Sequence, residues 1–410
     1  MTALPLSVRL PTAADVASPV VDEPVALLQL DLADPAEAAS AVYREVRRGR
    51  RVVAVACGRA DAPARLARAL NAIGVEAALP ASGEGLLGAG VAIVAGPGAA
   101  PARPMPASAR ALRVALAGCG VVGGGVAARL LADPRFDLVG VLVRDPGKAR
   151  DVVVPHDLLL SDPGALLARE PDVVIEAISE ASTGLALLRA ALSRGVDVVS
   201  ANKQAVGGDL PALTALAEAS GARLLYSASV GGGSPLIETV RRARAHGPVV
   251  AVEAVLNGTC NFILNRLAEG QAFGAALDAA RAAGFAEEDP SADLTGLDAA
   301  AKLAILAHEA AGWRLPVEAV SREALSAEQA LPPDGVRQIA RLNIEGRRAN
   351  VAFEARGGDP LFGDLADEGN ALRAITADGR VFTARGRGAG RAPTAESVWA
   401  DLTDLLASCE

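Results

Sequence analysis

One stretch, residues 112–130 (LRVALAGCGVVGGGVAARL), constrains the fold more than any other. A short apolar run is followed by glycines spaced Gly-x-Gly-x-x-Gly, and then by apolar residues at helical spacing. This order predicts a strand, a tight turn and the start of a helix. The first glycine permits the turn, the second lets a pyrophosphate approach the backbone, and the third lets the helix pack on the strand. The stretch predicts dinucleotide binding, with a plain glycine turn as the alternative. The candidate residues are Gly118, Gly120, Val121, Val122 and Gly123.

Strand and helix patterns alternate after this stretch. The predicted strands are 136–143, 172–177, 196–200 and 223–226, and the predicted helices are 184–193 and 210–220. Alternation on this scale predicts an α/β fold with a Rossmann-type, doubly wound parallel sheet.

The end of the second predicted strand bears on the choice of cofactor. An acidic residue at this place holds the ribose 2′-hydroxyl of NAD, whereas Arg suits the 2′-phosphate of NADP. Arg144 follows the strand directly, with Lys148 nearby, and this favours NADP. NAD stays open as the alternative, because Asp145 could turn toward the ribose instead.

Arginine has replaced lysine almost throughout the chain. Of the 40 basic residues, 37 are Arg, and the only lysines are Lys148, Lys203 and Lys302. An amine that gives and takes a proton cannot be an Arg, whose pKa stays above about 12. The lysines are therefore candidates for chemistry, and chance survival of three lysines is the alternative.

Composition excludes several classes of protein. A net charge of -8 argues against a nucleic-acid or anionic-membrane partner, and no apolar stretch is long enough for a membrane span. We expect a cytoplasmic protein that acts on a small molecule. The four cysteines are widely spaced, which suggests neither a metal site nor a disulfide framework.

The chain is expected to divide into several parts. They are a mobile tail (1–24), a small α/β N-terminal appendage (25–95), a linker (96–110), a dinucleotide-binding domain (111–240, with a return segment at 385–410), and an α/β substrate-binding and dimerisation domain (241–384). Within the appendage we expect strands at 25–32, 51–57 and 91–95 and helices at 35–48 and 62–73.

Five ordered motifs carry a family resemblance. They are ANK (201–203), ASVGGG (228–233), LNGTCNFIL (256–264), GFAEEDPSADLTGLDAAAKLAILA (284–307) and GRGAGRAPTAESVWADL (386–402). From about residue 111 onward the chain resembles the homoserine dehydrogenases. The resemblance implies NAD(P)-dependent interconversion of L-homoserine and L-aspartate 4-semialdehyde in threonine, methionine and isoleucine biosynthesis, by a homodimer or higher homo-oligomer.

The resemblance also assigns residues. It makes Lys203 and Lys302 the catalytic pair, and we expect neighbours to lower the pKa of a lysine that acts as acid or base. Asp298 lies four positions before Lys302, so on a helix the carboxylate can orient the amine, with an ordinary salt bridge as the alternative.

The resemblance implies that Asn202 packs against the nicotinamide, and a structural Asn in a turn is the alternative. Gly258, Thr259, Glu287 and Asp293 are implied to hold the amino acid, and Gly388 to return to the cofactor, although chain reversal also explains this glycine.

Some features leave other hypotheses open. Ser227 stands where the family has a Glu associated with a monovalent cation, so we expect no metal site. Cys260 could be an acylating nucleophile, as in semialdehyde dehydrogenases, but no histidine lies in a motif beside it. The appendage faintly resembles the start of an aspartate kinase without its Lys-Phe-Gly-Gly, so we expect no kinase activity. A non-catalytic, nucleotide-sensing protein is the alternative function.

Overall fold

The computed structural model describes residues 24–57, 61–75, 77, 91–95, 110–327, 335–355, 359–388 and 391–407. The chain forms two compact units, Met1–Pro104 and Met105–Glu410. The tail expected at 1–24 lies outside the described residues except for residue 24, as does the linker expected at 96–110 except for residue 110.

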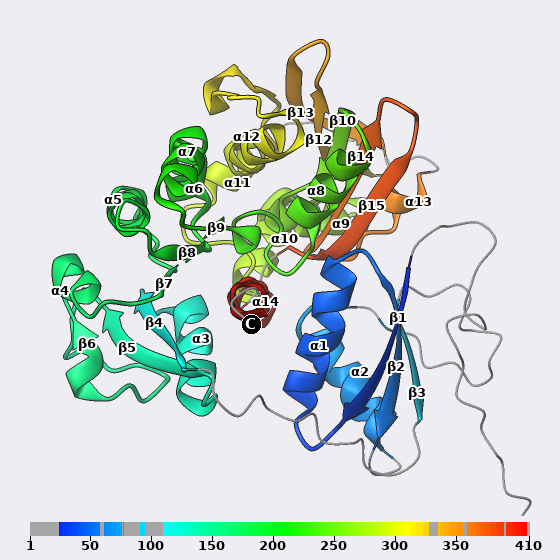
Figure 1. The fold of residues 1–410 in the computed structure, drawn as a ribbon. Coiled ribbons are helices and arrows are strands. Elements are labelled where there is room, and N and C mark those ends of the chain that lie inside the picture. The colour runs from blue at the N-terminus through cyan, green and yellow to red at the C-terminus, as the bar shows by residue number, and fades with distance from the viewer. Residues whose placement is uncertain are drawn as a thin grey trace, which may run out of the picture. The chain divides into compact units, whose positions relative to one another are not determined.

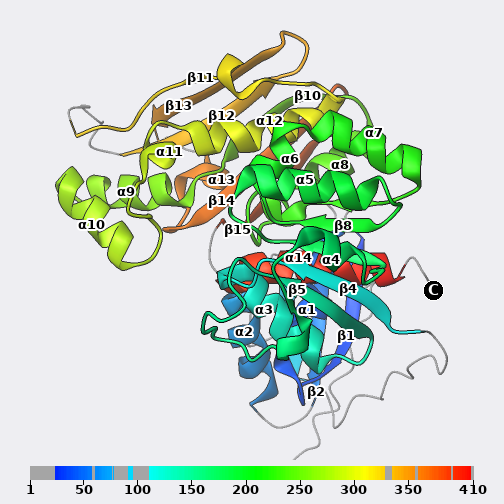
Figure 2. The same cartoon turned by 90° about the vertical axis from the view of Figure 1, so that its left-hand side faces the viewer.

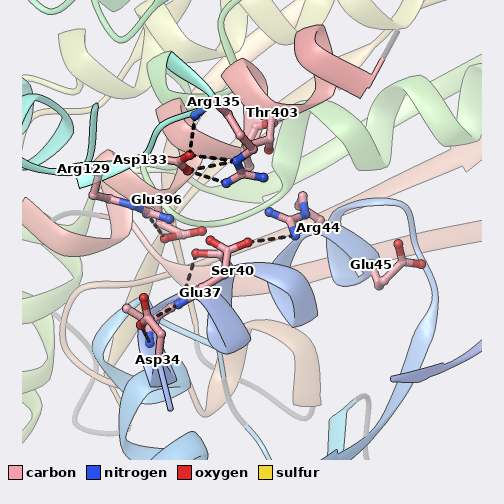
Figure 3. Close-up of polar contacts among 12 residues, drawn as sticks. Asp34, Glu37, Ser40, Arg44, Glu45, Arg129, Asp133, Arg135, Glu396 and Thr403 are labelled. Carbon is pink, nitrogen blue, oxygen red and sulfur yellow. Dashed lines mark hydrogen bonds and ion pairs between the residues drawn. The ribbon is translucent and has the colours of Figure 1, made fainter. Parts of the chain in front are cut away.

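The first unit holds a three-stranded parallel sheet in the order β1-β2-β3 (Figure 1). Its elements are β1 Val25–Asp31, α1 Pro35–Arg47, β2 Arg51–Cys57, α2 Ala62–Ala72 and β3 Val91–Ala95, which confirms the five elements expected here within one residue at each end. Asp34 starts α1 by accepting hydrogen bonds from the backbone N–H groups of Ala36 and Glu37 at 2.9 and 3.2 Å (Figure 3).

The first sheet of the second unit is parallel throughout, in the order β6-β5-β4-β7-β8-β9. Its elements are β4 Leu112–Ala117, α3 Val121–Ala132, β5 Phe136–Leu142, η3 His156–Leu158, β6 Leu159–Leu160, α4 Pro163–Leu167, β7 Val173–Glu176, α5 Ala181–Leu192, β8 Asp197–Ser200, α6 Lys203–Gly208, α7 Leu210–Ser220 and β9 Leu224–Leu225. Central strands such as β4 and β7 are buried on both faces and mostly apolar, as sheets covered by helices require. The chain crosses from one half of the sheet to the other between β4 and β7, where ligands bind in such folds.

The second sheet is mostly antiparallel, in the order β11-β13-β12-β10-β14-β15, and only its β11–β13 pair is parallel. Its strands are β10 Val249–Val255, β11 Ser321–Arg322, β12 Val336–Asn343, β13 Arg348–Ala355, β14 Gly369–Thr376 and β15 Val381–Arg387. The helices of this region are η4 Ser227–Ser229, α8 Leu236–His246, α9 Gly258–Ala268, α10 Phe273–Ala282, α11 Ser291–Leu294, α12 Leu297–Ala311, η5 Val317–Ala319, α13 Pro360–Gly363 and α14 Arg391–Ala407. Helices α8 and α12 cover one face of the sheet (Figure 1).

Helix α14 returns from the second sheet to the first and lies against α3 (Figure 2). Trp399 is buried there and meets the Phe136 ring edge-on, with the ring centroids 5.1 Å apart. Arg129 of α3 lies over the Trp399 ring and pairs with Glu396 at 2.6 Å (Figure 3). Aromatic burial and a partly buried ion pair therefore join the two helices.

Among the helices in the described part of the chain, none is both long enough and apolar enough to cross a bilayer.

Candidate active site

Helix α12 places Asp298 and Lys302 on one face, one turn apart, as their spacing predicts. The Asp298 carboxylate is buried, and its Oδ2 lies 2.8 Å from Nζ of Lys302. The Lys302 ammonium also donates to the backbone carbonyl of Leu256 at 2.8 Å. Only 11% of the Lys302 side chain is exposed, so this cation is fixed between two acceptors.

Lys203 reaches the same carboxylate from the parallel sheet. It is the first residue of α6, directly after the loop that follows β8, and its ammonium pairs with Oδ1 of Asp298. About a third of its side chain, 36%, remains exposed. One buried carboxylate therefore lies between two ammonium groups from different parts of the unit.

The charges at this cluster shift the ionisation of its members. Burial alone would raise the pKa of Asp298, but Lys302 and Lys203 together hold it below its usual range. Burial works against the charge of Lys203, yet Asp298 outweighs it and raises the pKa of the amine. The expectation that neighbours lower the pKa of Lys203 is therefore wrong: a carboxylate in contact keeps the amine protonated.

Asn257 completes the cluster, although sequence reasoning did not single it out. Its Nδ2 donates to Asp293 at 2.6 Å and to Oδ2 of Asp298 at 2.8 Å. Its Oδ1 accepts from the backbone N–H of Cys260 at 2.7 Å and so caps α9. An Asn directly before a helix start is a recognisable cap, and that pattern was the available signal.

Four predicted substrate residues lie around this cluster. Asp293 is half-buried, and burial, with help from Asp298, raises the pKa of its carboxyl. Thr259 donates to the carbonyl of Phe285 at 2.7 Å, and Gly258 packs closely against the backbone of Glu368. Glu287 is exposed, and its charge contributes to the raised pKa of Lys203. Two carboxylates therefore flank the Lys203 side of the cluster.

The three glycines after β4 play different parts. A Cβ at Gly118, where φ is +94°, would lie 2.4 Å from the carbonyl oxygen of Ala177, and one at Gly123 would lie 2.0 Å from the carbonyl oxygen of Gly118. A Cβ at Gly120 would meet no atom within 4 Å. The first and third glycines thus serve close packing, and the second leaves room above the N-terminus of α3. The residues present fit a dinucleotide there.

The two valines that follow differ in exposure. The Val121 side chain is 62% exposed at the first turn of α3. Val122 is half-buried against the apolar cluster under the helix. Val121 therefore offers an apolar surface beside the room at Gly120, whereas Val122 anchors the helix.

The loop after β5 carries the two predicted phosphate-binding cations. Arg144 and Lys148 are both exposed. Asp145 accepts from the backbone N–H of Gly147 at 2.8 Å, so its carboxylate closes its own turn. Arg150 donates to the carbonyl of Lys148 at 2.6 Å and also binds the carbonyl of Asp145, which fixes the loop. Arg144 is an exposed cation just after β5, where the 2′-phosphate of NADP lies in folds of this type.

The side chain of Asn202 has the structural role that was the alternative. Its Oδ1 accepts from the backbone N–H groups of Gln204 and Ala205, both at 3.1 Å, and caps α6. Its Nδ2 donates to the carbonyl of Ile178 at 2.9 Å and to Glu176 at 3.2 Å. Both donors and both acceptor positions of the amide are used. Packing of Asn202 against a nicotinamide stays a prediction, and it can involve only the surface of the amide.

Close packing accounts for Gly388. Its N–H donates to the carbonyl of Glu368 at 2.8 Å, and a Cβ there would lie 2.4 Å from the amide atoms of Asn370. The carbonyl of Gly388 in turn faces Gly232 in the ASVGGG motif, 2.8 Å from the position of a Cβ there. Its predicted contact with the cofactor stays a prediction.

The thiol of Cys260 is buried completely. Burial, followed by the charges of Asp293 and Asp298, raises the pKa of this thiol far above its usual value. The thiol donates to the carbonyl of Asp293 at 3.2 Å. Since the thiolate is the nucleophile, these surroundings argue against the acylating alternative.

The polar groups of Ser227 are hydrogen-bonded to a residue of α14. Its N–H and its hydroxyl donate to the two carboxylate oxygens of Asp401, at 3.0 and 2.8 Å. Asp401 is fully buried, and nothing in the sequence pairs it with Ser227. Within the described ranges there is no group of three His, Cys, Asp or Glu side chains that could hold a metal ion.

Known proteins share this arrangement of sheets. The family profile described as "Homoserine dehydrogenase, NAD binding domain" matches residues 118–227, and the profile described as "Homoserine dehydrogenase" matches residues 235–403. Homoserine dehydrogenase of Corynebacterium glutamicum is 34% identical over 319 residues, which are 71% of this chain and 71% of that protein. The Synechocystis sp. protein of the same name is 30% identical over 322 residues, or 72% of this chain and 73% of that protein.

Solved structures agree with these matches. A homoserine dehydrogenase from Thiobacillus denitrificans has a TM-score of 0.63 at 27% identity, covering 73% of this chain and 75% of that chain. A hyperthermophilic archaeal homoserine dehydrogenase in complex with NADPH shares the fold, with a TM-score of 0.64 at 23% identity over 73% of this chain and 98% of that chain.

Proposed function

Because the chain belongs to the homoserine dehydrogenase family, it is an NAD(P)-dependent oxidoreductase of amino-acid biosynthesis, and we propose that Lys203, Lys302 and Asp298 carry its proton chemistry. The reaction interconverts L-homoserine and L-aspartate 4-semialdehyde. The observation that carries the proposal is the buried Asp298 carboxylate held between the two ammonium groups.

The two lysines are suited to different tasks. In aldehyde reduction a proton must reach the carbonyl oxygen, and the bound nicotinamide supplies the hydride. Lys203 is partly exposed and is kept protonated by Asp298, so its ammonium can donate a hydrogen bond to that oxygen and then the proton. Lys302 is more deeply buried and already donates to Leu256, so it holds Asp298 and the substrate oxygen in place. In the reverse direction the neutral Lys203 amine accepts the proton of the alcohol.

The acidic groups beside Lys203 suit the other end of the substrate. Glu287 and Asp293 face the same region as the Lys203 ammonium, as their effect on its charge indicates. We assign them to the substrate ammonium, with Gly258 and Thr259 shaping the pocket at the start of α9. A non-catalytic, nucleotide-sensing protein would not need this arrangement, and nothing in it favours that alternative.

Exposed Arg144 and Lys148 support a preference for NADP over NAD, because the Asp145 carboxylate is engaged in its own turn.

Three further points stay predictions. They are the cytoplasmic location, the domain roles assigned to residues 111–240 and 241–384, and the absence of kinase activity from the appendage.

We propose that the chain forms a homodimer, and that the interface is the face of the second sheet opposite α8 and α12. Arg341 and Arg373 flank Glu253 there, and Arg341 also pairs with Glu354 at 2.7 Å. Arg341 and Glu354 each keep 37% of their side chains exposed. A row of alternating charges can match a second copy of itself across a two-fold axis.

Nicotinamide absorbance, followed with homoserine and either NADP or NAD, tests the reaction directly. We expect homoserine-dependent reduction of the cofactor. A folded protein that shows no such change with either cofactor would contradict the assignment.

A further inference from the structure

Glu176 is a fully buried carboxylate that the proposed chemistry does not use. It is the last residue of β7, at the carboxyl end of the parallel sheet. Its Oε2 accepts from the hydroxyl of Ser200 at 2.6 Å, and its Oε1 accepts from the N–H of Ile178 at 2.9 Å and from Nδ2 of Asn202 at 3.2 Å. A charge in this place is costly, and burial raises the pKa of the carboxyl despite its hydrogen bonds.

An apolar residue at position 176 would avoid that cost, since the rest of β7 is apolar and buried. The carboxylate therefore has some use other than filling the core. Its partners show what that use is, because two of the three belong to the segment that ends in Lys203: Ser200 closes β8, and Asn202 caps α6.

The chain directly after Glu176 touches the cofactor loop. Ala177, the next residue, donates its N–H to the carbonyl of Ala117 at 2.8 Å, and its own carbonyl lies against Gly118. Glu176 thus lies between the glycine loop and the start of the helix that carries Lys203.

We propose that Glu176 is a positioning residue: by holding Nδ2 of Asn202 it fixes the first turn of α6, and with it the place of the Lys203 ammonium against Asp298. The inference rests on the proposed role of Lys203. The amine must meet a carboxylate that α12 supplies, so a shift at the start of α6 changes the contact directly. Misplacement of a catalytic group by about 1 Å can cost about a hundredfold in rate.

Glu176→Ala removes both carboxylate oxygens and the three hydrogen bonds that they accept, whereas Glu176→Gln keeps Oε1 for Ile178 and Asn202 and can donate to the Ser200 hydroxyl, which can turn to accept. We expect Glu176→Ala to lower kcat by about ten- to a hundredfold while the Kd for the cofactor changes less than about twofold. In the direction of aldehyde reduction, where Lys203 must carry a proton, the alkaline limb of the pH–rate profile should move to lower pH, because Lys203 loses the Asp298 contact that raises its pKa. Glu176→Gln should restore most of the turnover.

A second variant perturbs the same contact without removing any polar group. A Cβ at Gly184 of α5 would lie 2.8 Å from Nδ2 of Asn202 and 3.0 Å from Oε1 of Glu176. Gly184→Ala should therefore push the pair apart and reproduce the loss of kcat and the shift of the alkaline limb, even if Glu176→Ala does not fold.

The matched control is Glu309→Ala, which removes another buried carboxylate with several partners. Glu309 accepts from Tyr226 and from Arg241, toward the far end of α12 from Asp298. Its loss should lower stability but leave the alkaline limb in place. If Glu176→Ala and Gly184→Ala behave like this control, the inference is wrong. If Lys203→Arg itself keeps full turnover, the proposed chemistry fails instead, so the two failures are distinguishable.

Discussion

Replacing Asp298 by Asn should destabilise the protein, because the Asp298 carboxylate compensates the charges of the two lysines that it contacts. The carboxylate accepts from Lys203 on Oδ1 and from Lys302 and Asn257 on Oδ2. An amide has one oxygen and one NH₂ group, so in either orientation its NH₂ group must face at least one donor. The substitution also removes the negative charge while both ammonium groups stay.

The size of the effect follows from burial. Removing one partner of a buried ion pair costs about 3 to 5 kcal/mol, because it leaves a buried charge without compensation. Lys302, at 11% exposure, meets this condition, whereas Lys203 is relieved by solvent. We therefore expect the free energy of unfolding to fall by about 3 kcal/mol, the lower end of that range. A protein of ordinary stability survives this loss and can be assayed.

The loss should also depend on pH. The pKa of Asp298 is depressed, so its contribution to stability is present above the unfolded value near 4 and is lost as pH falls through the folded value. The pKa of Lys203 is raised, so its contribution is complete below the unfolded value near 10.4 and is lost as pH rises through the folded value. The difference between wild type and Asp298→Asn should stay constant between about pH 5 and 9 and shrink at either extreme.

Urea unfolding at several pH values measures this difference. The control is Asp137→Asn, since Asp137 is 52% exposed and lies 3.3 Å from Arg113. An exposed pair of this kind contributes about 0 to 1 kcal/mol. Equal free energies of unfolding for wild type and Asp298→Asn at neutral pH would refute the reasoning.

Three further predictions concern the cofactor, the appendage and the cation. Arg144→Ala should weaken the binding of NADP more than that of NAD, because Arg144 is the exposed cation at the proposed 2′-phosphate site; equal losses in a titration would remove it from that site. A truncated chain that begins at Ala109 should fold and keep its turnover, since the second unit is compact by itself; insoluble or inactive protein would show that the appendage is required. Sodium and potassium should change activity little beyond ionic strength, because Asp401 engages Ser227; a several-fold activation by one of them would contradict this.

The parallel sheet could be read from the sequence because its signals are local. Apolar runs separated by glycine turns and helical patterns predicted its central strands, with shifts of only a few residues. The largest shift is at α5, which begins at Ala181 rather than at residue 184, because the Glu180 side chain caps it by accepting from Ser182 and Thr183. The second sheet gave no such signal, since pairs such as Glu253 with Arg341 are set by strands far apart in the chain.

The site was predicted in part. The scarcity of lysine singled out Lys203 and Lys302, and the spacing of Asp298 placed it beside one of them. Its contact with the other lysine depends on how α12 packs against α6, and no local pattern encodes this. The buried partners Glu176 and Asp401 were missed for the same reason.

Turnover of Lys203→Arg, measured by nicotinamide absorbance with homoserine, tests the central claim most directly. Arginine keeps the positive charge beside Asp298 but cannot release a proton near neutral pH. Lys148→Arg, an exposed lysine outside the cluster, is the control and should be nearly silent. We predict that Lys203→Arg loses at least about a hundredfold in kcat while it still binds the cofactor. We predict a similar loss for Lys302→Arg, because the larger guanidinium does not fit the buried place from which the Lys302 amine holds Asp298 and the substrate oxygen. If the Lys203→Arg and Lys302→Arg variants keep most of their turnover, the amines are only counter-charges to Asp298, and the proposed proton chemistry is wrong.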